Sequence, residues 1–189
     1  MVVLGALGYS TSSLKGMPLR RGAQQRTNGV PSKGKGLLPT PSSFMKIYYW
    51  NVRGLKRPLK QHKVVSLMKK NKLDVCGLVE TKLASSTVSF MHKLQLKHWR
   101  FLSNVTVSNT PRILVFWNPS TVKVELINLT TQGLHVTISR VNNCSFTATF
   151  VYGYNTIIAR KPLWEDLQRW NSNSHRIILV DFSSLISRG

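Results

Sequence analysis

The sequence predicts a mixed α/β domain, an α+β arrangement with much antiparallel pairing, that begins near Met45. Strand-like and helical patterns alternate at first, which is typical of strands joined by covering helices. Four strand-like runs then follow one another closely, which indicates antiparallel pairing, and a helix and a strand come last. Residues 1–44 are basic, rich in Ser, Pro and Gly, and free of such patterns, so we expect a disordered tail followed by a domain at 45–189.

The first half of the domain is expected to alternate strands and helices. Residues 46–50 combine β-branched and aromatic side chains and predict the first strand. Pro58 suits the first turn of a helix, and apolar residues recur at helical spacing after it, with lysines on the other face. A buried strand is expected at 73–79 and a second helix at 84–96.

The second half is expected to consist mainly of strands. Apolar and polar residues alternate clearly at 134–139, which predicts a strand with one buried face. Pro162 is expected to open a third helix, because proline is favoured in the first turn. The strands of this half are predicted at 113–117, 122–127, 134–139, 146–152 and 176–181.

The net charge and the cysteine content limit which functions and cellular locations suit this chain. A formal charge of +21, from 27 Lys and Arg against 6 Asp and Glu, predicts a polyanionic partner, with nucleic acid the first candidate. The sequence contains no uninterrupted apolar run long enough to predict a membrane-spanning helix. Cys76 and Cys144 lie among apolar residues, so we expect reduced thiols, an intracellular location and no disulfide-linked partner.

Polar residues end three of the predicted strands. Asn51, Glu80 and Asp181 each follow an apolar run directly. Side chains at strand ends on one rim of a sheet converge from distant parts of the sequence. An amide and two carboxylates there would suit Mg²⁺, which prefers oxygen ligands. The alternative is that each residue simply ends its strand.

Six segments together resemble a known family. They occur in the order MKIYYWNVRGL (45–55), DVCGLVET (74–81), RILVFWNP (112–119), FVYGYN (150–155), RKPLWEDL (160–167) and ILVDFS (178–183). This series resembles the endonuclease domain of plant LINE-type (non-LTR) retrotransposons, within the endonuclease/exonuclease/phosphatase superfamily. The resemblance implies a four-layer α/β sandwich of two mixed, mostly antiparallel sheets with outer helices. It also implies a hydrolase that cuts DNA with Mg²⁺ as cofactor.

The resemblance assigns roles to six residues. Glu80 would be the principal Mg²⁺ ligand, with Asn51 beside it in the metal and phosphate site. Tyr152 would donate a hydrogen bond to the scissile phosphate, and Asn155 would help to order that loop. Asp181 would orient and deprotonate the attacking water. Ser183 stands in the phosphate-binding position where the family has asparagine, and its shorter side chain is expected to fall short.

The sequence ends at Gly189, before the Asp and His segments that the family carries further on. We therefore expect a C-terminally truncated, inactive fragment that encodes the first sheet and a stub of the second. Its inner face would then be uncovered, so that the chain is marginal alone and self-associates or aggregates. The apolar residues expected on that exposed face are Val136, Ile138, Phe146, Ala148, Phe150 and those at 177–179.

Two alternatives remain open. The chain is a competent nuclease if missing sequence or a partner completes it. Otherwise it is a basic, non-catalytic nucleic-acid-binding module, because cations gather around the first predicted helix at Lys56, Arg57, Lys60, Lys63, Lys69, Lys70 and Lys72. A functional protein would be nuclear, and organellar targeting by residues 1–44 is less favoured than a linker role.

Overall fold

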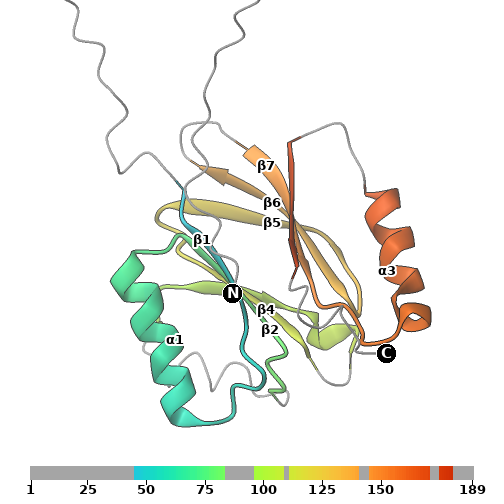
Figure 1. Cartoon of the computed structure of the whole chain (residues 1–189). Helices are drawn as coiled ribbons and strands as arrows, with labels where there is room; N and C mark the ends of the chain where they lie inside the picture. The colour runs from blue at the N-terminus through green and yellow to red at the C-terminus, as the bar shows by residue number, and fades with distance from the viewer. Residues whose placement is uncertain (1–44, 84–95, 109–110, 141–144, 171–174, 181–189) are drawn as a thin grey trace, which may run out of the picture.

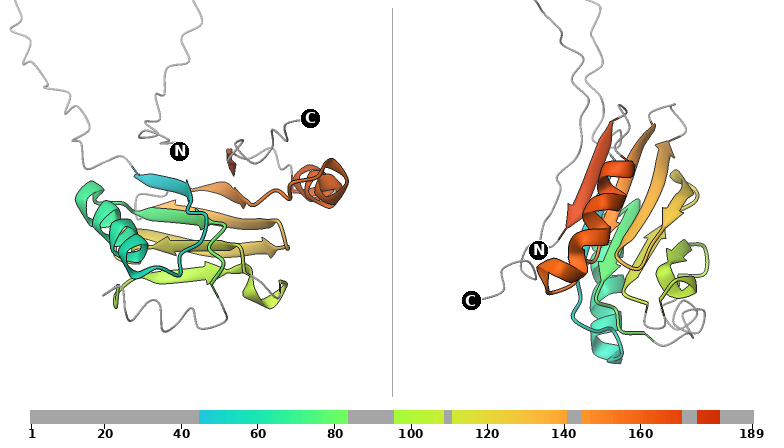
Figure 2. Two further views of the ribbon diagram at one scale, coloured as in Figure 1. Left: turned by 60° about the horizontal axis from the view of Figure 1, so that its bottom comes forward. Right: turned by 90° about the vertical axis from the view of Figure 1, so that its right-hand side faces the viewer.

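Two four-stranded sheets pack against each other in the computed structural model of the chain (Figure 1). The structure describes residues 45–83, 96–108, 111–140, 145–170 and 175–180. Helices α1 and α3 lie on opposite outer sides of the pair of sheets (Figures 1 and 2). This is the α/β sandwich of two mixed sheets that the sequence predicts, while the predicted tail at 1–44 lies outside the described residues.

The first sheet has the strand order β1-β2-β4-β3. Strand β1 pairs with β2 in parallel, and β4 pairs antiparallel with both β2 and β3. A short 3-10 helix, η2, spans Asn104–Thr106 after β3. The strands are β1 (Ile47–Asn51), β2 (Val75–Val79), β3 (Arg100–Ser103) and β4 (Ile113–Trp117).

The second sheet has the strand order β5-β6-β7-β8. Strands β5, β6 and β7 form an antiparallel meander, and β8 pairs with β7 in parallel. A register shift interrupts the β5–β6 ladder between Leu126 and Asn128. The strands are β5 (Val122–Leu129), β6 (Gly133–Arg140), β7 (Ser145–Val151) and β8 (Arg176–Val180).

Each parallel strand pair is joined through a helix on the outer side of its sheet. Helix α1 (Pro58–Asn71) has Pro58 in its first turn, as predicted, and buries residues that include Val64 and Met68 in the outer core of the first sheet. Helix α3 spans Ile157–Arg169. The prediction that it begins at Pro162 is wrong, because the Thr156 side chain accepts a hydrogen bond from the Ala159 amide and caps the helix earlier.

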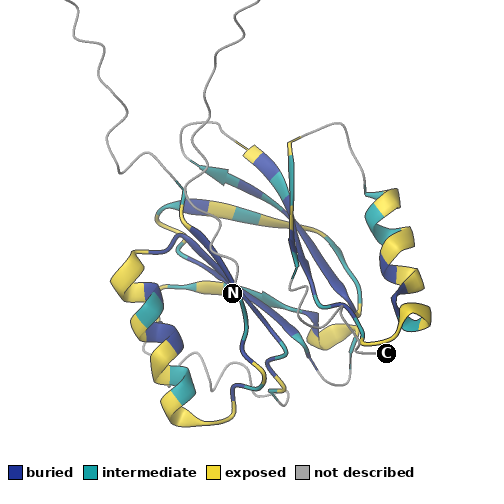
Figure 3. Ribbon diagram, viewed as in Figure 1, coloured by how far each residue is buried: buried dark blue, intermediate teal, exposed yellow. Residues whose placement is uncertain are grey.

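The inner faces of both sheets are buried in one shared core, as the colouring of Figure 3 shows. The expectation of an uncovered inner face is therefore wrong. The first sheet covers the apolar residues expected to be exposed, and only Ile178, on the outer face, is 44% exposed. The buried residues of that set are Val136, Ile138, Phe146, Ala148, Phe150 and Leu179.

The described residues form two four-stranded sheets, whereas one sheet and a stub of the second were expected. The run at 113–117 was expected to start the meander, but it forms β4 in the first sheet. Strand β3 was not predicted, and with it both sheets reach four strands. The helix predicted at 84–96 lies outside the described residues except for Leu96. None of the helices in the described part of the chain is long and apolar enough to cross a membrane.

Candidate active site

Parallel pairing places Asn51 and Glu80 side by side. Asn51 ends β1 in register with Val79, the last residue of β2, so Glu80 is the next residue along. The Asn51 Nδ2 atom donates a hydrogen bond to Glu80 Oε1 at 2.9 Å. Two of the three polar strand ends predicted from the sequence therefore meet. Asp181 and Ser183 lie outside the described residues.

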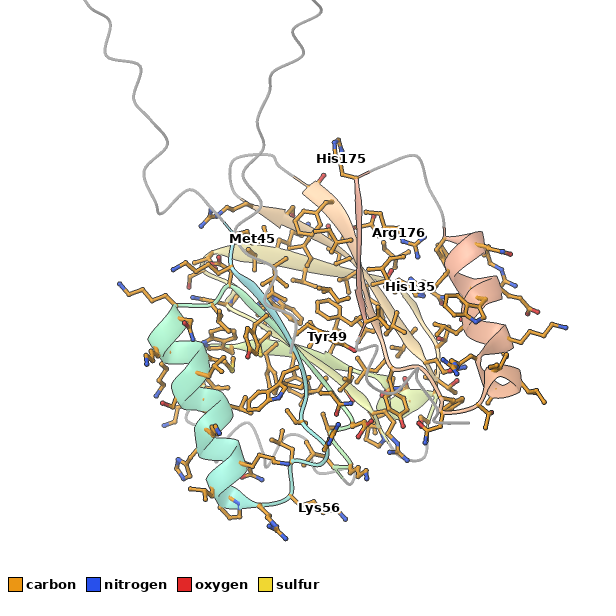
Figure 4. All side chains as sticks on the ribbon, viewed as in Figure 1. Met45, Tyr49, Lys56, His135, His175 and Arg176 are labelled. Atoms are coloured by element: carbon orange, nitrogen blue, oxygen red, sulfur yellow. The ribbon has the colours of Figure 1, made fainter. Side chains whose placement is uncertain are left out.

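The second sheet presents its own pair of parallel strand ends at the same side. Val151 and Val180 are in register at the ends of β7 and β8, and Tyr152 follows β7 directly. The Tyr49 hydroxyl donates a buried hydrogen bond to the Val151 carbonyl at 2.5 Å. Since Tyr49 lies on β1, this bond ties the strand that carries Asn51 to the one that leads to Tyr152 (Figures 1 and 4).

The loop after β1 holds the Asn51–Glu80 pair in a fixed orientation. The Arg53 amide donates to Asn51 Oδ1 at 3.0 Å, which leaves the Asn51 amide group to face Glu80. The Gly54 amide donates to the Glu80 carbonyl at 2.6 Å. Glu80 itself has φ 54°, a left-handed conformation that costs a residue with a Cβ atom about 1 kcal/mol or more. Such strain is often kept at functional sites.

Tyr152 lies against Arg112, whose carbonyl accepts a hydrogen bond at 3.5 Å from the amide of Thr81, the residue after Glu80. The Arg112 guanidinium is 5.4 Å from the centroid of the Tyr152 ring. Burial raises the pKa of Tyr152 above its ordinary value, Arg112 opposes this shift, and Glu80 and Tyr154 add to it. The phenol therefore keeps its proton at neutral pH and is available as a hydrogen-bond donor.

Gln132 holds the loop that carries Tyr152, and no local pattern of the sequence marks it as a site residue. Its carbonyl accepts from the Tyr152 amide and its Oε1 from the Tyr154 amide, both at 2.9 Å. Its Nε2 donates to the carbonyl of Ala159 in α3 at 2.9 Å, and the residue is only 2% exposed. Asn155, predicted to order this loop, is exposed, and its carbonyl accepts from the Arg160 guanidinium at 3.3 Å.

Asn104 is a second residue that sequence reasoning missed. It is fully buried, and its Oδ1 accepts from the amides of Arg112 and Ile113 at 2.9 and 3.0 Å. Its Nδ2 donates to the Thr131 carbonyl at 3.0 Å. Asn104 thus joins Arg112 and the start of β4, which follows it, to the turn that carries Gln132. Only a buried position, which the sequence does not reveal, distinguishes Asn104 from other polar residues.

Glu80 is the residue best suited to hold a cation. Within the described ranges no three His, Cys, Asp or Glu side chains gather at one point. Glu80 uses Oε1 for Asn51 and keeps its second carboxylate oxygen for a ligand. Mg²⁺ often binds proteins through one or two carboxylates and several waters, so the arrangement fits that ion. Asn51 serves here to orient Glu80.

No family model matches the chain. Its fold is nevertheless shared by several solved structures. Humanized D. rerio TDP2 aligns with a TM-score of 0.52 at 18% identity, over 74% of this chain and 64% of that one. The endonuclease domain of TRAS1, a telomere-specific non-LTR retrotransposon, aligns with a TM-score of 0.53 at 12% identity, over 69% and 56%. An endonuclease/exonuclease/phosphatase family protein from Bacteroides thetaiotaomicron aligns with a TM-score of 0.52 at 10% identity, over 70% and 61%.

The fold is that of the endonuclease/exonuclease/phosphatase proteins. At these identities the similarity establishes the fold, as the sequence resemblance implied, and not the activity. The chain spans 64% of the TDP2 structure and 56% of the TRAS1 domain.

Proposed function

We propose that the chain carries the site of a divalent-metal-dependent phosphodiesterase that cleaves DNA, of the LINE retrotransposon endonuclease kind. One observation carries the proposal. A carboxylate, Glu80, is oriented by Asn51 at 2.9 Å, and the Thr81 amide next to it donates to the carbonyl of Arg112, whose guanidinium is 5.4 Å from the centroid of the Tyr152 ring. The parallel strand ends of two sheets bring these groups together from distant parts of the sequence. The plant origin rests on the six sequence segments, and the TRAS1 domain supports the retrotransposon setting through its fold.

Each described residue has a defined task in phosphodiester hydrolysis. Glu80 would hold Mg²⁺, which when bound supplies positive charge to stabilise the developing negative charge on phosphate. Asn51 keeps the Glu80 carboxylate in place, and Tyr152 donates a hydrogen bond to a phosphate oxygen. Arg112 adds positive charge beside Tyr152. For Asp181 we retain the role in water activation that the sequence resemblance implies, and Ser183 occupies the phosphate-binding position with a side chain expected to fall short of the phosphate.

A plasmid-nicking assay with Mg²⁺ tests this function. Glu80→Gln keeps the size of the side chain and an oxygen for Asn51 but removes the charge, and we expect nicking to fall about a hundredfold or more. Glu165→Gln, which makes the same change at an exposed site on α3, is the matched control and should nick like the wild type. Equal nicking by wild type and Glu80→Gln would contradict the proposal.

The same assay separates the two other hypotheses for the chain. If neither protein nicks DNA but both retain it, the non-catalytic binding module is favoured. If neither nicks, and adding the Asp- and His-bearing segments of the family restores nicking, the chain is the inactive fragment predicted from the sequence. An intracellular, nuclear location belongs to the proposal, because the proposed substrate is DNA.

A further inference from the structure

A buried polar cluster lies between the outer face of the second sheet and α3 (Figure 4). At its centre is His135 on β6, which is 0% exposed. Its Nδ1 atom is 3.0 Å from the Thr149 hydroxyl on β7. Its ring centroid is 6.1 Å from that of Trp170, the C-cap residue of α3. His135 therefore contacts both the sheet and the end of the helix that covers it.

Arg176 on β8 brings a positive charge into this cluster. Its Nη2 atom donates to the Thr149 hydroxyl at 3.4 Å, and its Nη1 atom donates to the Leu167 carbonyl of α3 at 2.9 Å. Arg176 and Asp166 on α3 are the charged groups that act on His135. Its partners in register on the neighbouring strands, Asn128 on β5 and Thr149 on β7, are uncharged.

The second ring nitrogen of His135 faces the start of its own strand. His135 Nε2 is buried and has no hydrogen-bond partner among the described residues. A Cβ atom at Gly133 would lie 3.0 Å from this nitrogen, so the imidazole packs directly against the Gly133 backbone. The absence of a side chain at residue 133 therefore lets the ring lie there.

Gly133 follows Gln132, the residue that holds the loop of Tyr152. The Gln132 carbonyl accepts from the Tyr152 amide, and its Nε2 donates to the Ala159 carbonyl of α3, both at 2.9 Å. His135 and Gln132 thus lie on either side of Gly133, and both contact α3. Gln132 does so near the start of the helix, and His135 does so at its end through Trp170.

Only the neutral imidazole suits this position. A protonated imidazole carries a hydrogen on each ring nitrogen, and the hydrogen on Nε2 would face Gly133 without an acceptor. It would also place a second positive charge beside Arg176 in a site that is closed to water. Moving α3 and the Gln132 turn apart lets water reach the ring and removes both costs.

We propose that His135 is a positioning residue for Tyr152, and that its protonation in mild acid releases α3 and the Gln132 turn and so loosens the loop that carries Tyr152. The consequence for cleavage rests on the proposed function, which gives Tyr152 a phosphate to bind. The loosening itself is a property of the chain alone and can be measured without metal or substrate.

Amide hydrogen exchange of the full-length chain between pH 7.5 and pH 5.5 tests the proposal. Each rate is divided by the intrinsic rate at the same pH, which gives a protection factor. The reporters are the amides of Tyr152 and Tyr154, both of which donate to Gln132. The amide of Gln61, which donates to the Arg57 carbonyl at the start of α1, reports on local opening elsewhere.

Two variants separate His135 from a general effect of acid. His135→Asn removes the group that titrates. His62→Asn makes the same change at an exposed position on α1 and is the matched control. Thermal unfolding at pH 7.5 shows that each variant folds.

Below about pH 6.5 the opened state binds a proton that the closed state does not, so protection of the Tyr152 and Tyr154 amides should fall by up to about tenfold per pH unit. Protection at Gln61 should stay constant. The fall should persist in His62→Asn and disappear in His135→Asn. Constant protection of the two tyrosine amides in the wild type, an equal fall at Gln61, or an equal fall in His135→Asn would overturn the proposal.

Arg176→Gln keeps the test decisive if His135→Asn does not fold. Arg176 lowers the pKa of His135 in the closed state, so removing its charge brings that pKa closer to the value in the opened state. The pH-dependent loss of protection at Tyr152 and Tyr154 should therefore be smaller than in the wild type. A loss as large as that of the wild type would overturn the proposal.

This proposal and the proposed function fail in different ways. If Glu80→Gln still nicks DNA while protection at Tyr152 follows His135, the proposed active site is wrong and the positioning role stands. If nicking depends on Glu80 while protection at Tyr152 ignores His135, the positioning role is wrong and the proposed function stands.

Discussion

Two residues, Glu80 and His135, adopt a backbone conformation or a protonation state that is unfavourable for their residue type. In each case the neighbouring groups explain why. Glu80 is left-handed although it has a Cβ atom, because the Gly54 and Leu55 amides bind the carbonyls of Glu80 and Thr81 and fix the backbone there. That Asn51 and Glu80 lie together could be predicted, because each directly follows an apolar run. The left-handed backbone of Glu80 could not, since no local pattern in the sequence requires it.

His135 is a buried ionisable residue outside the candidate active site. It lies between the outer face of the second sheet and α3, where its Nδ1 is 3.0 Å from Thr149 Oγ1 (Figure 4). Burial lowers its pKa below 6.5, Arg176 on β8 lowers it further, and Asp166 on α3 opposes the shift. The folded protein therefore holds the imidazole neutral at pH values where the unfolded chain would already bind a proton.

The unfolding free energy of the protein should consequently decrease at acidic pH, because His135 takes up a proton more readily in the unfolded state. Above about pH 6.5 this residue has no effect, because it is neutral in both states. As the pH falls below 6.5, the unfolded state gains the proton first, so the unfolding free energy drops by at most about 1.4 kcal/mol per pH unit. Urea unfolding at pH 7.5 and 5.5 measures the loss. His135→Asn should reduce it, and an unchanged pH dependence in that variant would contradict the assignment.

Local sequence patterns predicted which helices and strands form better than where each begins and ends. Strands β1, β2, β4, β6 and β7 could be predicted because their apolar runs or alternation are unambiguous. Strand β3 could not, because Arg100–Ser103 has only four residues and no buried face. Helix α3 begins five residues before Pro162, because the capping hydrogen bond is made by the side chain of Thr156.

Gly77 marks a close approach between β2 of the first sheet and β7 of the second. It lies in the middle of β2, and a Cβ atom at this position would overlap the ring of Phe150 on β7. Both residues belong to strands that lead to the site, β2 to Glu80 and β7 to Tyr152. The absence of a side chain at residue 77 therefore sets how near these two strands come.

Gly77→Ala should destabilise the protein by about 1–3 kcal/mol, because the methyl group overpacks a rigid core. Urea unfolding measures the loss. Gly77→Ala combined with Phe150→Leu should recover part of it, since the smaller side chain leaves room for the methyl group. Additive losses in the double variant would show that the Phe150 ring is not what confines Gly77.

For the whole molecule, the sequence could indicate strands but not their partition into sheets. The residues Ile113–Trp117 are buried on both sides of the strand. The sequence of such a strand does not indicate whether it belongs to the first sheet or the second. Only the pairing of β4 with β2 and β3 decides its place. Self-association was expected because the inner face of the sheet was thought to be uncovered. The inner faces are in fact buried, so self-association stays a prediction but loses that reason.

The two sheets should unfold as one unit, because residues of both form one shared core. Tyr49 on β1 packs against Phe150 on β7, with ring centroids 6.5 Å apart, and its hydroxyl binds the Val151 carbonyl. Tyr49→Phe keeps the ring and removes only that hydrogen bond. We expect it to lower the unfolding free energy by about 1–2 kcal/mol, since a buried carbonyl loses a partner.

Amide hydrogen exchange can show whether this loss is shared. In Tyr49→Phe, the slowest amides of β4 in the first sheet and of β6 in the second should lose the same protection, because both exchange only through global opening. Protection lost from one sheet alone would mean that the sheets open separately. The Asn51–Glu80 pair and Tyr152 would then not be held together by the fold, because the core shared by the two sheets is what keeps both parts of the proposed site at one edge.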